Sequence, residues 1–158
     1  DPRLHLVVVG EGPMGAAIER LGAELPGSVT WIRGVDHAEV PALVRAMDVA
    51  VAPYARLERF YFSPLKVLEY LAAGRAVVAS AIGQLPALVR DGETGLLVDP
   101  GDARALAGAI RRLADDPALR AGLGARAALD ARRHHSWDDR AARILALADA
   151  RAGGSVAA

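Results

Sequence analysis

The sequence reads PLKVLEYLAAG from Pro64 to Gly74 and AVVAS from Ala76 to Ser80. A proline is tolerated in the first turn of a helix, and a glycine commonly follows the last turn. The second run is apolar throughout, without the alternating polar residues of a half-exposed strand, so it predicts a strand that is covered on both faces. A helix followed by such a strand is typical of a parallel sheet with helices on both sides.

The same alternation of short apolar runs and helical patterns extends along the chain. Runs that predict strands lie at residues 4–9, 29–32, 48–52, 76–80 and 94–98. Patterns that predict helices lie at residues 14–25, 39–47, 65–73, 103–114, 117–132 and 136–151. Right-handed crossovers between parallel strands then give an α/β fold of the doubly wound, Rossmann-like type with a C-terminal helical segment. We expect one domain over residues 1–152 and a mobile tail over 153–158.

The composition excludes several classes of protein. The 158 residues include 19 basic and 19 acidic side chains, and a formal net charge of zero argues against a sequence-independent nucleic-acid binder. The lack of cysteine excludes disulfides and thiolate metal sites. No apolar run approaches the roughly 20 residues that span a bilayer. All of the basic residues except Lys66 are arginine.

In doubly wound sheets, ligands bind beyond the carboxyl ends of the strands. The loops that follow the predicted strands are 10–13, 34–37, 53–64 and 80–85. The third of these loops leads into the helix that begins near Pro64, where the backbone N–H groups of Leu65 and Lys66 and the helix dipole favour a phosphate. Glu69 lies about one turn further along, where a carboxylate is better placed to accept hydrogen bonds from sugar hydroxyls than to approach a diphosphate.

An ordered set of segments resembles the family 4 glycosyltransferases, a large retaining class with the GT-B fold. The resemblance covers nearly the whole chain and is carried by residues 8–13, 29–34, 48–53, 64–74, 77–80, 83, 91–98 and 100–102. It implies that this chain is the donor-binding, Rossmann-like half of such an enzyme. Any one of these segments is a weak signal, and their order and spacing carry the assignment.

The resemblance also implies roles for individual residues. In this family a glutamate that matches Glu69 binds the donor ribose, and backbone amides that match Leu65 and Lys66 hold the diphosphate. The remaining residues of the implied donor site are Ser63 and Pro64 in the same motif and Gly34 and Val35 near the base. The residues implied to face the cleft between the two domains are Gly10, Gly12, Pro13 and Tyr61.

Two departures from the family pattern bear on activity. In the family, Glu69 would be the second member of a Glu-x7-Glu pair whose first glutamate contacts the transferred sugar. That first position is Tyr61 here, and Glu58 is nearby but out of register. The first strand and helix of the donor domain, the diphosphate-clamping arginine and lysine, and the acceptor domain would all precede Asp1. We therefore expect the chain to belong to a longer enzyme and to be inactive by itself. The catalytic residues are not identified from the sequence.

The expected donor is a UDP- or GDP-linked sugar, and the expected acceptor is a glycan, a lipid-linked sugar or a small metabolite. No metal and no cofactor is expected, and nucleic acid is not an expected partner. The expected location is cytoplasmic, with membrane contact at the inner face made by the missing half. The last helix is expected to pack toward that half through Ile144, Leu145 and Leu147.

Other readings of the same residues stay open. A sugar-nucleotide epimerase on the same scaffold would need acid and base residues in the cleft, where only His37 is near. A non-catalytic nucleotide-binding or interaction module is compatible with Tyr61. Residues 10–15 spell Gly-x-Gly-x-x-Gly, but no acidic residue ends the second strand, which disfavours a dinucleotide oxidoreductase. His134 and His135 are expected in a solvated loop and not at a metal.

Overall fold

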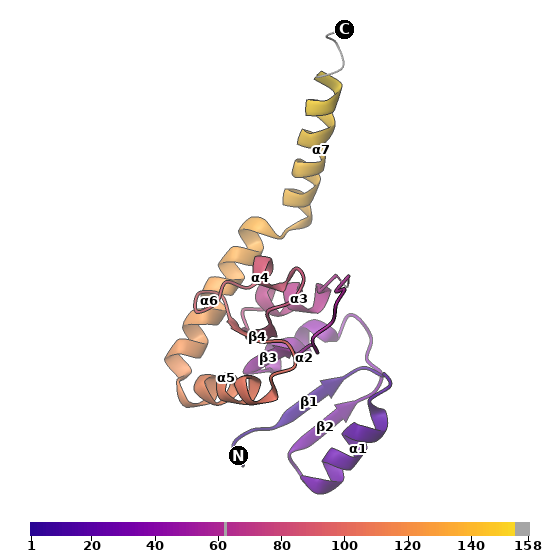
Figure 1. The fold of residues 1–158 in the computed structure, drawn as a ribbon, viewed down its shortest axis with the longest axis vertical. Coiled ribbons are helices and arrows are strands. Elements are labelled where there is room, and N and C mark those ends of the chain that lie inside the picture. Colours follow the sequence, from indigo (N-terminus) through magenta and orange to yellow (C-terminus); the bar gives the residue numbers. More distant parts are fainter. Residues whose placement is uncertain (62, 154–158) are drawn as a thin grey trace. The chain divides into compact units, whose positions relative to one another are not determined.

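The computed structural model describes residues 1–61 and 63–153, with side chains as far as residue 150. The chain divides into two compact units, Asp1–Leu43 and Val44–Ala158 (Figure 1). The predicted strands and helices are recovered with small shifts at their ends, and each unit contains parallel strands with helices packed on them. The predicted tail lies outside the described residues beyond Gly153.

The first unit contains two parallel strands connected by a helix. The bounds of these elements are β1 Leu6–Val9, α1 Gly15–Glu24 and β2 Val29–Ile32. Strand β1 pairs with β2 in parallel, in the register Leu6↔Val29 to Val9↔Ile32. Helix α2, Val40–Ala46, follows β2 and extends past the boundary at Leu43.

Trp31 organises the packing of the first unit. Its indole N–H donates a hydrogen bond of 2.9 Å to the carbonyl of Gly10. Its ring lies against α1 at Gly15, where an added Cβ would come within 2.9 Å of the indole. The Arg33 guanidinium covers the ring at 4.1 Å from the ring centroid. Trp31 is thus a packing residue.

The second unit contains three parallel strands in the order β3-β4-β5. Its elements are β3 Val49–Ala52, α3 Leu65–Ala72, β4 Ala76–Ser80, α4 Leu85–Leu88, β5 Leu96–Val98, α5 Ala103–Asp115, α6 Pro117–His134 and α7 Trp137–Gly153. The four-residue helix α4 was not predicted.

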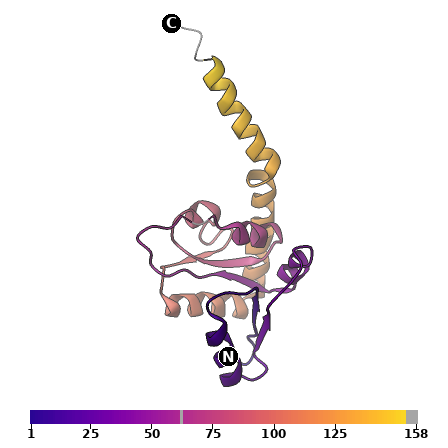
Figure 2. The same cartoon turned by 90° about the vertical axis from the view of Figure 1, so that its right-hand side faces the viewer.

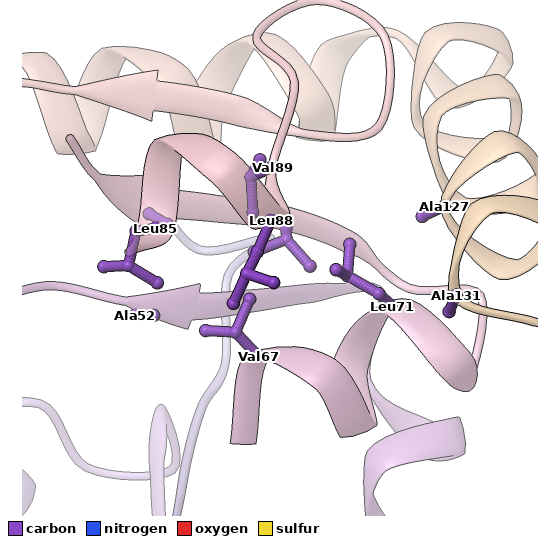
Figure 3. Packing of buried hydrophobic residues seen from close by; sticks show 10 residues of the cluster. Ala52, Val67, Leu71, Leu85, Leu88, Val89, Ala127 and Ala131 are labelled. Carbon is purple, nitrogen blue, oxygen red and sulfur yellow. The ribbon is translucent and has the colours of Figure 1, made fainter. Parts of the chain in front are cut away.

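The two faces of the β3-β4-β5 sheet feed two hydrophobic clusters because successive side chains of a strand point to opposite faces. Val77 and Ala79 of β4 pack with α3, α4 and α6, in the cluster that Figure 3 shows. Ala76 and Val78 of the same strand pack with Leu113 of α5 and with the first turns of α6. Figures 1 and 2 show α3 and α4 on one side of this sheet and α5 on the other. Strand β4 is therefore covered on both faces, as its continuously apolar sequence predicts.

A pair of glycines brings α6 against the end of α3. Gly74 follows α3 with φ of +69°, a conformation that glycine adopts without strain, and its N–H bonds to the Leu71 carbonyl at 2.9 Å. An ideal Cβ on Gly124 of α6 would overlap the Gly74 carbonyl oxygen and lie 3.0 Å from its carbon. The close contact between α3 and α6 thus depends on the missing side chain of Gly124.

Helix starts and breaks follow the predicted capping. Asp116 separates helices α5 and α6, and its carboxylate accepts the Leu119 N–H at 2.8 Å. Ser136 caps α7 by accepting the Asp139 N–H at 3.1 Å. The predicted bare residues of α7, Ile144, Leu145 and Leu147, are between 64% and 69% exposed. Trp137, at the start of the same helix, is also exposed.

Candidate functional site

The N-terminus of α3 forms at the carboxyl end of β3, as the sequence predicts. Pro64 is buried and takes the N-cap position directly before Leu65, the first helical residue, and its carbonyl accepts the Val67 N–H at 2.9 Å. The Leu65 N–H donates to the Ser63 carbonyl at 3.0 Å. In this conformation only the Lys66 amide of the predicted pair lacks a hydrogen-bond partner within residues 1–61 and 63–153. The Leu65 amide would have to exchange its bond to Ser63 for a bond to a ligand.

Lys66 and Glu69 both face solvent on α3. The Glu69 carboxylate makes no hydrogen bond or ion pair with any residue that the structure describes, although its backbone carbonyl accepts the Ala73 N–H at 2.9 Å. A carboxylate without such a partner can accept two hydrogen bonds from vicinal hydroxyl groups. The spacing of Lys66 and Glu69 places a cation in the first turn and an anion about one turn further on.

Aromatic residues of the loop between β3 and α3 support Lys66. The Lys66 ammonium lies 5.0 Å from the centroid of the Tyr54 ring, a cation–π distance. Phe60 meets the Tyr54 ring edge-on at 4.8 Å between centroids and an angle of 81°. Gly83, with φ of +57°, lets the chain after β4 pass directly over Phe60, because an added Cβ would overlap that ring. The sequence predicts Lys66 at the site but does not predict its contact with Tyr54.

Ser80 connects the ends of β3 and β4. Its hydroxyl accepts the Tyr54 N–H at 2.9 Å and donates to the Tyr54 carbonyl at 3.2 Å, and the side chain is buried. The Gly101 N–H donates to the same carbonyl at 2.9 Å. The backbone of Tyr54 is thereby fixed by the last residue of β4 and by the segment that follows β5. A serine at the end of a buried strand was the only signal of this role in the sequence.

A cavity of about 240 Å³ lies beside these carboxyl ends. It is lined by Pro53, Tyr54, Ala55, Ser80, Val98, Asp99, Gly101, Asp102, Ala103 and Leu106. The lining does not include Lys66 or Glu69, so the α3 N-terminus is an open surface and not the floor of this cavity. Tyr54 is shared by the cavity and by the contact with Lys66.

Tyr70, which follows Glu69 on α3, stays neutral. Burial raises the pKa of its phenol above the ordinary value, and the nearby charges of Glu69 and Tyr54 act in the same direction. A neutral phenol can still donate a hydrogen bond. Tyr61, which stands where the family usually has a glutamate, is 80% exposed.

The other predicted site residues belong to the Asp1–Leu43 unit. Gly10 follows β1 with φ of +103°, and its N–H donates to the Ile32 carbonyl at 2.9 Å. Gly12 and Pro13 complete the loop to α1, and both are exposed. Gly34 and Val35 follow β2, with Gly34 exposed and Val35 half-buried. These residues occupy the carboxyl ends of β1 and β2, and Ser63, Pro64, Leu65, Lys66 and Glu69 occupy that of β3 in the other unit.

His135 differs from the prediction of a solvated loop. Helix α6 extends through His134, and the His135 ring is only 14% exposed, with Nε2 at 3.5 Å from the buried Asp130 carboxylate. Arg90 donates to the other Asp130 oxygen at 2.8 Å, and the hydrogen bonds of Arg90 to Asp130 and Glu93 raise its pKa. His135 therefore belongs to a structural network. Within the described residues no group of three or more His, Cys, Asp or Glu side chains is placed to hold a metal ion.

The fold and the site together define a Rossmann-like type of α/β domain, with parallel strands and a helix N-terminus at their carboxyl ends. A family model described as "Glycosyl transferases group 1" matches residues 1–116. The chain belongs to this family. In the described part of the chain, no helix is long and apolar enough to cross a membrane.

Known proteins agree with this assignment. The chain is 32% identical to a phosphatidyl-myo-inositol mannosyltransferase of Mycolicibacterium smegmatis, over 98% of this chain and 39% of that protein. It superimposes on sucrose-phosphate synthase from Thermosynechococcus elongatus with a TM-score of 0.79 at 34% identity, over 96% of this chain and 39% of that one. HepE from Anabaena, solved with UDP and glucose, gives a TM-score of 0.70 at 26% identity, over 83% of this chain and 36% of that one. The chain thus spans about two fifths of the length of such proteins.

Proposed function

We propose that this chain is the donor-binding part of a retaining glycosyltransferase that uses a nucleoside diphosphate sugar. The observation that carries the proposal is the exposed N-terminus of α3, with Lys66 held over Tyr54 and Glu69 one turn further on. The diphosphate would lie over the amides of Leu65 and Lys66, and the Glu69 carboxylate would accept hydrogen bonds from the ribose hydroxyls. Ser63 and Pro64 would shape the turn beneath the phosphates.

The chemical part of the proposal concerns the leaving diphosphate. Sugar transfer releases a nucleoside diphosphate, and positive charge aimed at that group lowers the barrier. The helix dipole and the Lys66 ammonium supply such charge at one point. We propose that no metal takes part, because these groups and a cationic clamp from the rest of the enzyme would meet the same need.

The relatives indicate a donor and an acceptor class without fixing either. HepE was solved with UDP and glucose, which supports a UDP-sugar, and the mannosyltransferase is named for transfer of mannose to a phosphatidylinositol. We propose UDP- or GDP-linked sugars as donors and a glycan, lipid-linked or small-molecule acceptor. We also propose that Gly34 and Val35 lie near the base and that Gly10, Gly12, Pro13 and Tyr61 face the cleft between donor and acceptor domains.

Calorimetric titration with UDP, GDP and NAD tests the donor site. We expect UDP or GDP to bind more tightly than NAD, and Lys66→Gln to weaken that binding about tenfold, the effect of losing one charge-assisted hydrogen bond. Arg104→Gln removes the same charge from an exposed position on α5 and should leave the affinity unchanged. Tighter binding of NAD than of either diphosphate would contradict the proposal.

A non-catalytic nucleotide-binding module is the second candidate, and Tyr61 is the observation that favours it. A phenol cannot replace a glutamate as a hydrogen-bond acceptor for two sugar hydroxyls. Under this alternative the titration would still show diphosphate binding, but the free nucleotide and the nucleotide sugar would bind equally. Tighter binding of a nucleotide sugar than of its nucleotide would favour the transferase.

A further inference from the structure

A second cavity of the Val44–Ala158 unit lies at the amino ends of the strands, and the N-terminus of α3 lies at their carboxyl ends. It has a volume of about 200 Å³ and is lined by Asp48, Gly74, Arg75, Ala76, Pro117, Arg120 and Ala121. Asp48 directly precedes β3 and Arg75 directly precedes β4, so the cavity is at the amino ends of these strands. Two of its three charged side chains are arginines.

Arg75 is fixed in the cavity wall by carbonyls at the ends of two helices. Its Nε donates to the Ala73 carbonyl at 3.2 Å, and its Nη1 donates to the carbonyls of Arg45 and Met47 at 3.1 and 3.0 Å. Its Nη2 has no hydrogen-bond partner among the residues that the structure describes. Three hydrogen bonds through Nε and Nη1 therefore hold the guanidinium in place, and Nη2 stays available to a ligand.

Arg120 on α6 is held in a similar way. Its Nη1 donates to the Leu113 carbonyl at 2.7 Å at the end of α5. Its Nη2 lies 3.9 Å from Asp48 Oδ1, which is too long for a hydrogen bond, and within the described chain its Nε has no partner. The Arg120 side chain is 24% exposed, whereas that of Asp48 is 86% exposed. Asp48 is thus a solvated counter-charge that can move away.

Each of the two arginines uses only some of its guanidinium nitrogens to bond carbonyls at helix ends. These are Nε and Nη1 of Arg75 and Nη1 of Arg120. Within the described residues this leaves three nitrogens without a hydrogen bond, on two side chains that both line the cavity. The N-terminus of the 18-residue helix α6, at Pro117, borders the same space, where the capping carboxylate of Asp116 offsets its partial positive charge. Guanidinium groups bind oxyanions through paired hydrogen bonds, and arginines that are already ordered lose little entropy on binding.

We propose that this cavity binds a small oxyanion, inorganic phosphate or the phosphate group of a metabolite, through Arg75 Nη2 and the Nε and Nη2 of Arg120. A volume of about 200 Å³ is that of about seven water molecules, which leaves room for one phosphate group. Asp48 competes with the anion for Arg120. The site is separate from the proposed donor site and does not depend on it.

An NMR titration with inorganic phosphate, against sodium chloride at equal ionic strength, tests this site. We expect phosphate to shift the side-chain Nε–H signals of Arg75 and Arg120 and the backbone amides of Gly74 and Ala121. We expect Asp48→Asn to tighten phosphate binding severalfold, because it removes the competing carboxylate. Arg120→Gln should weaken binding about tenfold or more.

Two further variants separate this site from others. Lys66→Gln should leave the phosphate-induced shifts at Arg75 and Arg120 unchanged, since Lys66 lies at the other edge of the sheet. Arg120→Lys, which retains the charge but loses the paired donors, should recover only part of the lost affinity. The proposal is overturned if phosphate shifts no signal of the cavity beyond the chloride control, or if Asp48→Asn fails to tighten binding.

Discussion

Single residues decide the chemistry that the α3 N-terminus can offer. Glu69 is exposed and unpaired within the described residues, so its carboxylate is available to a ligand. Lys66 is exposed too, but its ammonium is positioned by Tyr54, and Tyr54 is itself fixed by Phe60 and Ser80. The two charged residues therefore differ in how strongly the fold holds them.

We predict that Glu69→Ala weakens the binding of a nucleoside diphosphate without unfolding the protein. A carboxylate that accepts hydrogen bonds from ribose contributes about 1.5–3 kcal/mol to binding, and an exposed side chain contributes little to folding. Glu58→Ala is the matched control, since Glu58 is also exposed in the preceding loop but outside the motif. Calorimetry and a melting curve measure the two effects. Equal affinities for both variants would make Glu69 an ordinary surface residue.

Sequence reasoning identified these residues but not their conformations. The position of Lys66 at the start of a helix follows from Pro64 and the apolar pattern after it. That the Leu65 N–H bonds to the Ser63 carbonyl depends on the dihedral angles of one turn, which composition and periodicity do not determine. His135 was misjudged for a different reason, because its burial depends on Asp130 and Arg90, and Arg90 is distant in sequence.

At the scale of elements, the fit between α3 and α6 depends on Gly124. We predict that Gly124→Ala destabilises the protein by about 1–3 kcal/mol, because the new methyl group would overlap the Gly74 carbonyl and force the helices apart. Gly108→Ala on α5 is the matched control, since no atom lies within 4 Å of its added Cβ. That change should stabilise by about 0.4–1 kcal/mol, as glycine-to-alanine changes in open helical positions do.

Denaturant unfolding of the two glycine variants measures both effects. A Gly124→Ala protein as stable as Gly108→Ala would show that α6 does not approach α3 as closely as described. Since α3 carries Lys66 and Glu69, movement of its last turn would also reach the candidate donor site. Loss of stability with unchanged nucleotide affinity would limit the effect to the packing of the helices.

Helices and strands could be predicted where their apolar pattern extends over enough residues. The five strands were found because each is a mainly apolar run, and four of the five are closed directly by glycine, proline or a charged residue. Helix α4, Leu85–Leu88, was missed because four residues are too few to show helical periodicity. The division of parallel strands into β1-β2 and β3-β4-β5 was also not predicted, because pairing partners are not written in local sequence.

At the scale of the whole molecule, the chain spans 39% of the length of the mannosyltransferase that it resembles. The family resemblance implies that the acceptor binds on another domain and that part of the positive charge at the diphosphate comes from outside these residues. We predict that this chain by itself binds a donor but does not transfer its sugar. Within a full-length enzyme of this family it should do so.

Donor consumption with and without acceptor, measured for residues 1–158 and for a full-length protein, tests this prediction. Slow hydrolysis of the donor by the chain alone is compatible with it, because an open site admits water. Robust acceptor-dependent transfer by the chain alone would contradict it. Addition of the acceptor domain should also reduce the exposure of Ile144, Leu145 and Leu147, which hydrogen exchange along α7 would detect.

The contact between Lys66 and Tyr54 has a practical consequence that follows from the arginine-rich composition. Lys66 carries the only side-chain amine in the sequence, so an acylating reagent has a single lysine to modify, beside the terminal amine. A lysine-specific protease likewise has one bond to cut, between Lys66 and Val67 in the first turn of α3. The proposed donor site thus holds a unique attachment point for a chemical label, and acylation at that point removes the charge that contacts the Tyr54 ring.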